Sequence, residues 1–123
     1  MTGIFETQLA EDEIIERVRV PKLSANARWG YVKLCRKAGE FANALAVAVA
    51  DPGRGYWRVV LGAASGPPIV LDGTSRLLAE RRGSELHDAV AADLDRAADR
   101  HFDEFQRNLH TAAAVRAVRQ VLQ

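Results

Sequence analysis

The first half of the chain alternates apolar and polar residues, which is typical of β-strands with one buried face. The clearest stretch starts at Tyr31 with apolar and basic residues in turn, breaks at Gly39 and resumes over 43–50 with alanines between leucine and valine. It predicts two neighbouring strands at the centre of one sheet, joined by a short polar corner. Further strands are expected over 4–9, 14–20, 56–62 and 69–71, with 41–61 forming a β-hairpin.

The apolar pattern changes to a helical period after residue 71. A short helix is expected over 74–82, opened by capping residues at 72–75 and ended by Gly83. Ser84 is expected to cap a second, longer helix that reaches Ala97. The last helix should bury one stripe of residues, namely Phe105, Leu109, Ala112, Val115, Val118 and Leu122.

Strands followed by helices predict an α+β fold, in which an antiparallel sheet of about four strands carries three helices on one face. Residues 1–123 are expected to form a single domain, since 48% hydrophobic and 27% charged residues are ordinary for a globular protein. The apolar runs are too short to cross a bilayer, and residues 1–6 lack the features of a signal peptide. A cytoplasmic protein without membrane contact is therefore expected.

The second central strand alternates small and larger apolar residues. One side holds Ala44, Ala46 and Ala48, and the other holds Leu45, Val47 and Val49. A row of alanines lets another surface approach closely. Two interpretations are open at this point: a helix packed tightly on the sheet, or a flat surface for a ligand or partner.

Charge is unevenly distributed, although the formal net charge is only +1. Residues 17–37 hold seven basic side chains and no acid, whereas residues 84–104 hold seven acids and only two arginines. The two segments either lie against one another in the fold or present a basic face to an anionic ligand or partner. Nucleic acid is the weakest candidate for such a partner, because the whole chain is nearly neutral.

The usual catalytic and metal-binding patterns are absent or weak. One cysteine, Cys35, excludes an internal disulfide or a multi-cysteine metal site within the chain and is expected to be a packed thiol. The glycines over 62–66 precede prolines and lack the lysine of a P-loop. Ser65 and Ser84 stand in no nucleophile elbow.

Histidines and carboxylates in the helical half offer no clearer site. His87, His101 and His110 are expected on solvated helix faces, because they lack metal-ligand spacing. Asp95 and Asp99 lie one turn apart and are likewise expected to be solvated. No metal site and no stand-alone active site are therefore predicted. The most interesting polar group is Lys33, Arg36 and Lys37. On a strand, Lys33 and Lys37 would point one way and Arg36 the other. Two interpretations are open: at least one of them faces a surface that the sheet shares with a partner, or they lie on a merely exposed strand face, since lysine commonly protects sheet edges.

Several segments together resemble a known family. Residues 5–7 (Phe-Glu-Thr), 13–21 (Glu-Ile-Ile-Glu-Arg-Val-Arg-Val-Pro) and 31–42 (Tyr-Val-Lys-Leu-Cys-Arg-Lys-Ala-Gly-Glu-Phe-Ala) are similar to the C-terminal domain of the FAD-binding (medium) subunit of molybdenum hydroxylases. That family includes carbon monoxide dehydrogenase and relatives of xanthine dehydrogenase. Residues 61–79 resemble its strand, proline and short-helix segment, and 105–109 resemble its last-helix motif.

The resemblance implies an accessory or C-terminal module of a flavoprotein subunit, which supports FAD-domain packing and electron transfer in an oxidoreductase complex. In the family, FAD lies on an N-terminal domain that these residues do not include, and molybdopterin and iron–sulfur clusters lie on partner subunits. No cofactor and no catalysis are expected for this chain alone. Its expected partners are the FAD domain and the other subunits, with the alanine-lined face and Lys33, Arg36 and Lys37 as the docking or flavin-adjacent surface. The alternative is a free-standing interaction module without redox activity that forms a homodimer or another homo-oligomer.

Overall fold

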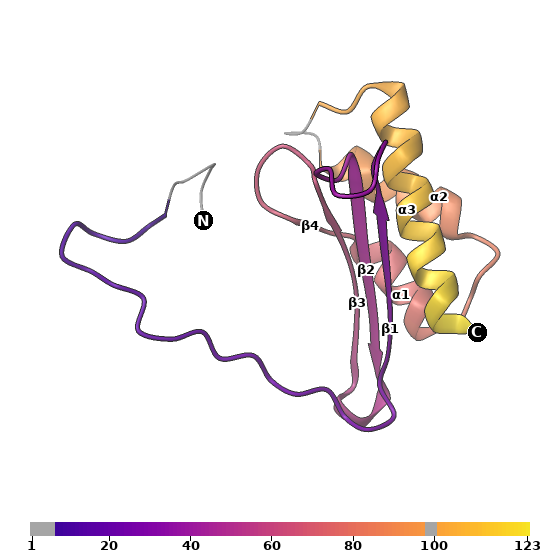
Figure 1. The fold of residues 1–123 in the computed structure, drawn as a ribbon. Coiled ribbons are helices and arrows are strands. Elements are labelled where there is room, and N and C mark those ends of the chain that lie inside the picture. The colour runs from indigo at the N-terminus through magenta and orange to yellow at the C-terminus, as the bar shows by residue number, and fades with distance from the viewer. Residues whose placement is uncertain (1–6, 98–100) are drawn as a thin grey trace.

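The computed structural model describes residues 7–97 and 101–123. Its centre is a four-stranded antiparallel sheet whose strands follow one another in chain order (Figure 1). The strands are β1 (Arg28–Leu34), β2 (Ala44–Asp51), β3 (Tyr56–Gly62) and β4 (Ile69–Val70), with a 3-10 turn at Pro52–Arg54. The helices are α1 (Asp72–Ala79), α2 (Leu86–Arg96) and α3 (Glu104–Leu122). The α+β fold expected from the sequence is confirmed.

All three helices lie on one side of the sheet (Figure 1). α3 crosses β1 and β2, α1 lies on β3, and α2 packs against α1 and α3. The alanine side of β2 is fully buried beneath them, with Ala44, Ala46 and Ala48 all at 0% exposure. The tight helix packing is therefore the correct interpretation of the alanine row. The alternative, that this face docks a ligand or partner, is wrong because α3 occupies it.

Gly30 sets how closely α3 approaches the sheet. A Cβ added to Gly30 would lie 2.1 Å from the carbonyl oxygen of Ala117 in α3. Only small residues allow such contact, and α3 accordingly buries Ala113, Ala114 and Ala117. The predicted stripe is partly wrong for the same reason: Phe105 is 67% exposed, and the helix is rotated so that its alanines face the strands.

The first central strand is shorter than predicted. β1 ends at Leu34, where the carbonyl accepts a hydrogen bond of 2.7 Å from the backbone N–H of Asn43 and closes the loop over 35–43. Within this loop Gly39 takes a φ of 88°, which favours glycine. Arg36 and Lys37 are therefore on a loop and not on the strand with Lys33. Cys35 also lies in this loop as a half-buried free thiol.

The strand predicted over 14–20 is wrong. These residues form no strand, and Ile14, Val18 and Val20 are 88%, 79% and 80% exposed. The segment before β1 runs away from the sheet (Figure 1). An alternating pattern becomes a strand only when a neighbour pairs with it, and no described strand lies beside this one. The strand predicted over 4–9 falls partly outside the described residues, and 7–9 are not a strand.

Two of the predicted helix starts also differ. α1 begins at Asp72 and ends at Ala79, and α2 is preceded by Glu85 with no side-chain cap, so Ser84 does not cap it. α3 instead has a complete capping box: the Asp103 carboxylate accepts from the N–H of Gln106 at 2.7 Å, and the Gln106 side chain accepts from the N–H of Asp103 at 3.2 Å. These reciprocal bonds satisfy helix donors that would otherwise lack partners.

Candidate functional site

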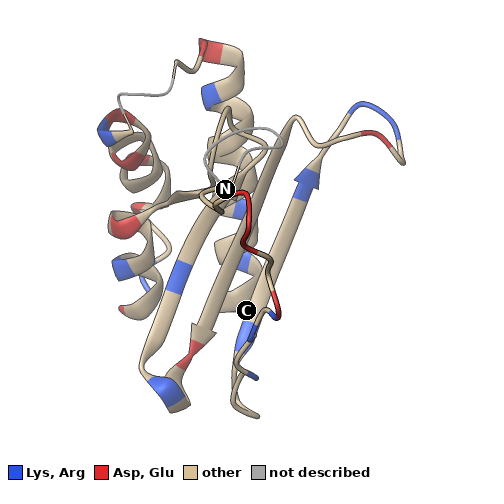
Figure 2. Cartoon of the chain, turned by 90° about the vertical axis from the view of Figure 1, so that its left-hand side faces the viewer, with Lys and Arg blue, Asp and Glu red and all other residues tan. Residues whose placement is uncertain are grey.

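The face of the sheet without helices carries exposed aromatic and aliphatic side chains. Strand register places side chains of all four strands next to one another on this face. We call it the open sheet face; it consists of Trp29, Tyr31, Lys33, Leu45, Val47, Val49, Arg58, Val60 and Val70. Figure 2 views the molecule from this side: the strands are largely uncharged, with scattered basic positions and one acidic position at a strand end.

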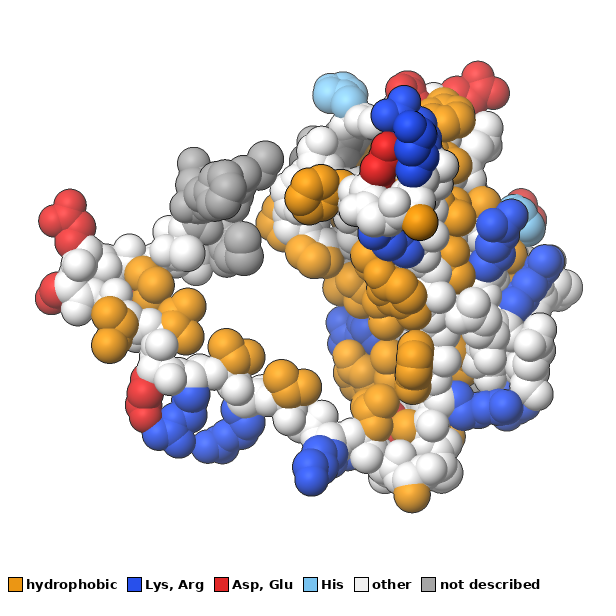
Figure 3. Space-filling model, in the orientation of Figure 1, with side chains coloured by type: hydrophobic (Ala, Val, Ile, Leu, Met, Phe, Trp, Pro, Cys, Tyr) orange, Lys and Arg blue, Asp and Glu red, His pale blue; other side chains and the backbone are white. Residues whose placement is uncertain are grey.

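The open sheet face is apolar and accessible. Trp29, Tyr31 and Val70 are 66%, 45% and 40% exposed. Hydrophobic side chains gather over the strands on the side turned towards the segment before β1 (Figure 3). Large exposed apolar patches of this kind mark contact surfaces, because water-exposed aromatic and aliphatic side chains gain free energy when covered.

The charges on the open sheet face are positive. Within the described residues, neither Lys33 nor Arg58 has a carboxylate at ion-pair distance. The Arg58 guanidinium lies 5.5 Å from the centre of the Tyr56 ring, a cation–π contact. The face thus combines aromatic and aliphatic side chains with cations that are free to meet an anionic group.

The structure separates the three basic residues that the sequence singled out. Lys33 lies on the open sheet face and lines a hollow of about 580 Å³ together with Tyr31, Phe41 and Leu45. Arg36 is on the loop beyond β1, with its Nε 3.8 Å from a carboxylate oxygen of Glu40, and Lys37 is exposed on the same loop. Lys33 therefore faces the candidate surface, while the other two border one end of it.

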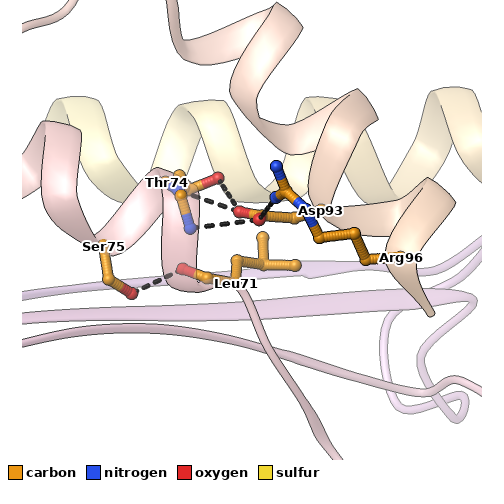
Figure 4. Close-up of polar contacts among 6 residues, drawn as sticks. Leu71, Thr74, Ser75, Asp93 and Arg96 are labelled. Atoms are coloured by element: carbon orange, nitrogen blue, oxygen red, sulfur yellow. Dashed lines mark hydrogen bonds and ion pairs between the residues drawn. The ribbon is translucent and has the colours of Figure 1, made fainter.

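A buried carboxylate joins two of the helices on the far side of the sheet (Figure 4). Asp93 of α2 accepts hydrogen bonds from the backbone N–H of Gly73 at 3.0 Å and of Thr74 at 2.8 Å, and from the Thr74 hydroxyl at 2.9 Å. Arg96 contacts the same carboxylate at 2.7 Å. Asp93 thus caps the first turn of α1 from a neighbouring helix.

Sequence reasoning missed this role, because Asp93 stands in an acidic run that resembles a solvated face. One signal was present: Asp93 follows Val90 by three residues and Leu86 by seven, so it shares their buried side of the helix. The N–H groups of Gly73 and Thr74 point at Asp93, which means that this helix end is not available to a phosphate. The cluster is structural.

Ser75 fastens α1 to the sheet. Its hydroxyl donates to the carbonyl of Leu71 at 2.6 Å (Figure 4) and accepts from the backbone N–H of Val59 at 2.9 Å. β4 has only two residues and does not reach the backbone N–H of Val59 in β3, so the Ser75 hydroxyl supplies the hydrogen-bond acceptor for that N–H.

Asp51 anchors the segment before β1 to the end of β2. Its fully buried carboxylate accepts from the backbone N–H of Ser24 at 3.0 Å and from the Ser24 hydroxyl, and lies 3.8 Å from Nε of Arg54. The hydrogen bonds from Ser24, followed by the charge of Arg54, hold the pKa of Asp51 below its usual value. This anchor leads the chain into β1.

His110 differs from the prediction for the histidines. His87 and His101 are exposed as expected, but His110 is only 1% exposed and packs edge to face on Phe102 with ring centres 5.0 Å apart. Burial lowers the pKa of His110, and its Nδ1 has no hydrogen-bond partner. Rotation of α3 towards the sheet brings this position inside.

The acidic and basic segments do not neutralise one another. In residues 7–97 and 101–123, no ion pair joins residues 17–37 to residues 84–104. Asp95 pairs instead with Arg107 of α3, and Asp99 lies outside the described residues. The described ion pairs therefore do not support the interpretation in which the two segments lie against each other.

The glycines at the end of β3 and at the start of α1 do not form a phosphate-binding loop. Gly62 ends β3 and is followed by a bend and prolines, while the first amides of α1 are bonded to Asp93. No group of three or more His, Cys, Asp or Glu side chains in the described part of the chain is placed to hold a metal ion. Among the same residues, no helix combines the length and hydrophobicity needed to span a membrane.

The fold is shared with parts of two solved oxidoreductases. The structure matches carbon monoxide dehydrogenase from Hydrogenophaga pseudoflava, in a form lacking the Mo-pyranopterin moiety of the molybdenum cofactor, with a TM-score of 0.69 over 98% of this chain and 45% of that chain, at 23% identity. It also matches quinoline 2-oxidoreductase from Pseudomonas putida, with a TM-score of 0.51 over 80% of this chain and 38% of that chain, at 16% identity.

The sequence comparison identifies one of these proteins as a relative. The chain is 32% identical over 93 residues to the carbon monoxide dehydrogenase medium chain of Hydrogenophaga pseudoflava, covering 72% of this chain and 32% of the relative. No protein-family profile matches. The chain is therefore a homologue of about a third of a molybdenum-hydroxylase medium subunit, and the resemblance to its C-terminal domain is confirmed.

Proposed function

We propose that this chain acts as the C-terminal module of a molybdenum-hydroxylase medium subunit and supports the FAD-binding part of that subunit through its open sheet face. The module itself holds no redox group in this proposal; FAD belongs to the part that it supports, and molybdopterin and iron–sulfur clusters belong to other subunits. Its contribution to electron transfer is to keep the flavin-bearing part correctly placed. The homology to a medium chain supports this function.

The observation that carries the proposal is the sequence of β2. Ala44 to Ala50 contain no polar side chain, so the strand is apolar on both faces. A strand with one wet face alternates apolar and polar residues, whereas a strand covered on both sides is apolar throughout. Helices cover only the alanine face, so the face with Val47 and Val49 is built to be covered by something else.

Lys33 would contribute to this contact from the edge of the apolar area. It lines the hollow with Tyr31, Phe41 and Leu45, and Phe41 is 97% exposed. A ring and an ammonium group on the same exposed hollow suit a partner surface that offers an apolar side chain and a carboxylate or phosphate. Arg36 and Lys37 would border the contact from the loop over 35–43.

A second copy of the chain could also cover the open sheet face, as in a free-standing homo-oligomer. The match to a medium chain favours the first function over this alternative. Native mass separates them: a homo-oligomer is self-sufficient, whereas the proposed module stays incomplete until it meets a flavin-binding part. A location in the cytoplasm stays a prediction.

A chimera tests the proposal. The matching third of the Hydrogenophaga pseudoflava medium chain is replaced by this chain, and FAD content, native mass and assembly with the other subunits are measured. We expect a flavin-containing chimera that assembles. Val47→Glu in the chimera should abolish assembly or FAD retention, because it places a charge in the middle of the covered face.

Ala91→Glu is the matched control, since Ala91 is an exposed residue of α2, the helix that packs against α1 and α3. It should leave FAD content and assembly unchanged. A folded chimera that retains neither FAD nor its partner subunits would contradict the proposal, and so would normal assembly of the Val47→Glu chimera.

A further inference from the structure

The outer edge of β1 forms a second surface, separate from the centre of the open sheet face. A groove of about 540 Å³ runs between this edge and the C-terminal half of α3. Its lining consists of Tyr31, Val32, Lys33 and Leu34 from the strand and Arg116, Arg119, Gln120 and Gln123 from the helix. β1 is the terminal strand of the sheet, so no described strand covers this edge.

The backbone of β1 directs hydrogen-bonding groups into the groove. The backbone N–H of Tyr31 donates to the Gln120 side chain at 2.9 Å and therefore points away from β2. In an antiparallel ladder, alternate residues point both their N–H and C=O the same way. Trp29 and Lys33 consequently present their backbone groups on the same outer edge, where they can pair with another strand.

The helix side of the groove is positively charged. Arg116 and Arg119 are exposed and lie three residues apart on α3, so they project on the same side of the helix. Among the described residues, neither arginine has an acidic partner, and Lys33 has none across the groove. The groove thus offers a strand edge on which Trp29 and Lys33 lack a neighbouring strand and the Tyr31 N–H is held by Gln120, beside two guanidinium groups without an acidic partner in the described residues.

We propose that this groove binds an extended acidic segment of a partner protein, which adds to β1 as a fifth strand. Its backbone pairs with Trp29 and Lys33. Its acidic side chains point to the helix side and meet Arg116 and Arg119, while the alternate side chains point to the other face beside Tyr31. A segment with an acid at every second residue suits this arrangement, because the side chains of an added strand alternate between the two faces of the sheet. The groove shares Tyr31 and Lys33 with the open sheet face, but Arg116 and Arg119 lie outside that face, so acidic-segment binding does not depend on the proposed function.

Charge argues against the chain itself as the occupant. The extended segment before β1 has Arg17 and Arg19 two residues apart, so they would lie on one side of an added strand. If this segment filled the groove with that side towards the helix, the two arginines would face Arg116 and Arg119. In a two-fold antiparallel pairing of β1 with a second copy, the helices of both copies lie on the same face of the joined sheet. Their arginines would then approach one another, and like charges repel. An acidic segment of another protein has neither problem.

The test uses a fluorescein-labelled peptide with the sequence Glu-Val-Glu-Thr-Glu-Val-Glu-Thr-Glu and the full chain. We expect saturable binding in fluorescence anisotropy that weakens as salt rises. The double variant Arg116→Glu/Arg119→Glu should bind at least about tenfold more weakly, and Arg116→Gln/Arg119→Gln should be intermediate. Arg76→Glu serves as the control with unchanged binding, and circular dichroism verifies that every variant is folded.

Two further measurements identify the mode of binding. A peptide with proline at its centre should bind much more weakly, because proline cannot donate to the edge. Amide hydrogen exchange at Trp29 and Lys33 should slow on binding. Equal binding of a peptide with Lys in place of Glu, full binding by the charge-reversed variant, absence of saturable binding, or dimers joined through β1 would each overturn the proposal.

These outcomes are distinguishable from failure of the proposed function. Val47→Glu should leave peptide binding intact while it impairs the chimera. Arg116→Glu/Arg119→Glu should impair peptide binding while the chimera still retains FAD. Loss of both activities in either variant would mean that the two surfaces are one site, which contradicts the separate groove.

Discussion

Single residues decide how the helices are attached to one another. Asp93 is 5% exposed and makes four polar contacts, to Gly73, Thr74 and Arg96, that join α2 to the start of α1. An exposed carboxylate at the end of a helix contributes little, but a buried one that satisfies several donors cannot be removed without leaving those donors unpaired. The stability of the helical layer therefore depends on this side chain far more than on its acidic neighbours.

Replacement of Asp93 provides a direct test. We expect Asp93→Ala to lower the free energy of unfolding by about 3 kcal/mol, because two backbone N–H groups and one hydroxyl lose a charged acceptor. Urea denaturation measures the change. Asp88→Ala is the control, since Asp88 is exposed on the same helix and should change stability by less than about 0.5 kcal/mol. Equal effects of the two substitutions would show that the Asp93 contacts contribute nothing.

His110 predicts a pH dependence. Its pKa is lowered in the folded state by burial, whereas in the unfolded chain it has the ordinary value of about 6.5. The unfolded state then binds more protons below about pH 6.5, so the contribution of His110 to stability is complete above that pH and is lost as the pH falls towards its folded pKa.

The measurement is the urea midpoint of the wild type and of His110→Leu between about pH 7.5 and 5.5, the range that brackets the unfolded histidine pKa. The wild type should lose more stability than the variant as the pH falls. His87→Gln removes an exposed histidine and should keep the wild-type slope. A slope that survives in His110→Leu would assign the effect to other groups.

At the scale of elements, the close contact between α3 and the sheet is the feature most sensitive to side-chain size. Gly30 leaves no room for a methyl group, because its Cβ would overlap the Ala117 carbonyl oxygen at 2.1 Å. The obstacle is the backbone of a nineteen-residue helix, which can yield only by moving as a unit. This contact fixes which side of α3 is buried.

Gly30→Ala should therefore destabilise the domain by about 3 kcal/mol or unfold it, at the upper end of typical overpacking effects. The melting temperature and urea midpoint report the change. Gly83→Ala is the matched control, since the Cβ there would meet only Leu122 at 3.7 Å, an ordinary contact. A Gly30→Ala protein of normal stability would mean that α3 does not sit where the structure places it.

At the scale of the whole molecule, the sheet is covered on one side only. Helices occupy the alanine side, and the open sheet face with Trp29 and Tyr31 remains in contact with water (Figures 1 and 3). An antiparallel sheet can leave one face in water, but that face is then usually polar, whereas this one carries aromatic and aliphatic side chains. The open sheet face therefore has the composition of a contact surface.

Trp29 provides a probe of that assembly. In a Trp57→Phe background it is the only tryptophan of the module, because the chain has two. Its emission should be red-shifted in the free module, where 66% of the residue is exposed, and should shift to the blue when the open sheet face is covered by a flavin-binding part. The reciprocal Trp29→Phe variant retains Trp57 and should show little change. Unchanged Trp29 emission in an assembled complex would show that this face stays uncovered.

Local patterns predicted much of the fold. The strands β2 and β3 and their hairpin follow from alternation and from the turn residues over 51–55, and all three helices follow from apolar spacing. The pattern failed over 14–20, where alternation exists without a partner strand. Side-chain periodicity records which face a strand would bury, but it does not say whether a neighbouring strand is present.

The sequence by itself determined the class of fold, the order of its elements and the resemblance to a medium subunit, because these depend on residue types and their spacing. Only the tertiary structure decided which side of α3 is buried, that Asp93 and His110 lie inside, and that Lys33 shares a surface with Trp29 and Val47 while Arg36 does not. Each of these depends on how closely two elements that are distant in the chain approach one another. Gly30 and the alanines of α3 and β2 set that distance. The distance depends on how the two elements pack together, so the sequence of either element alone does not give it.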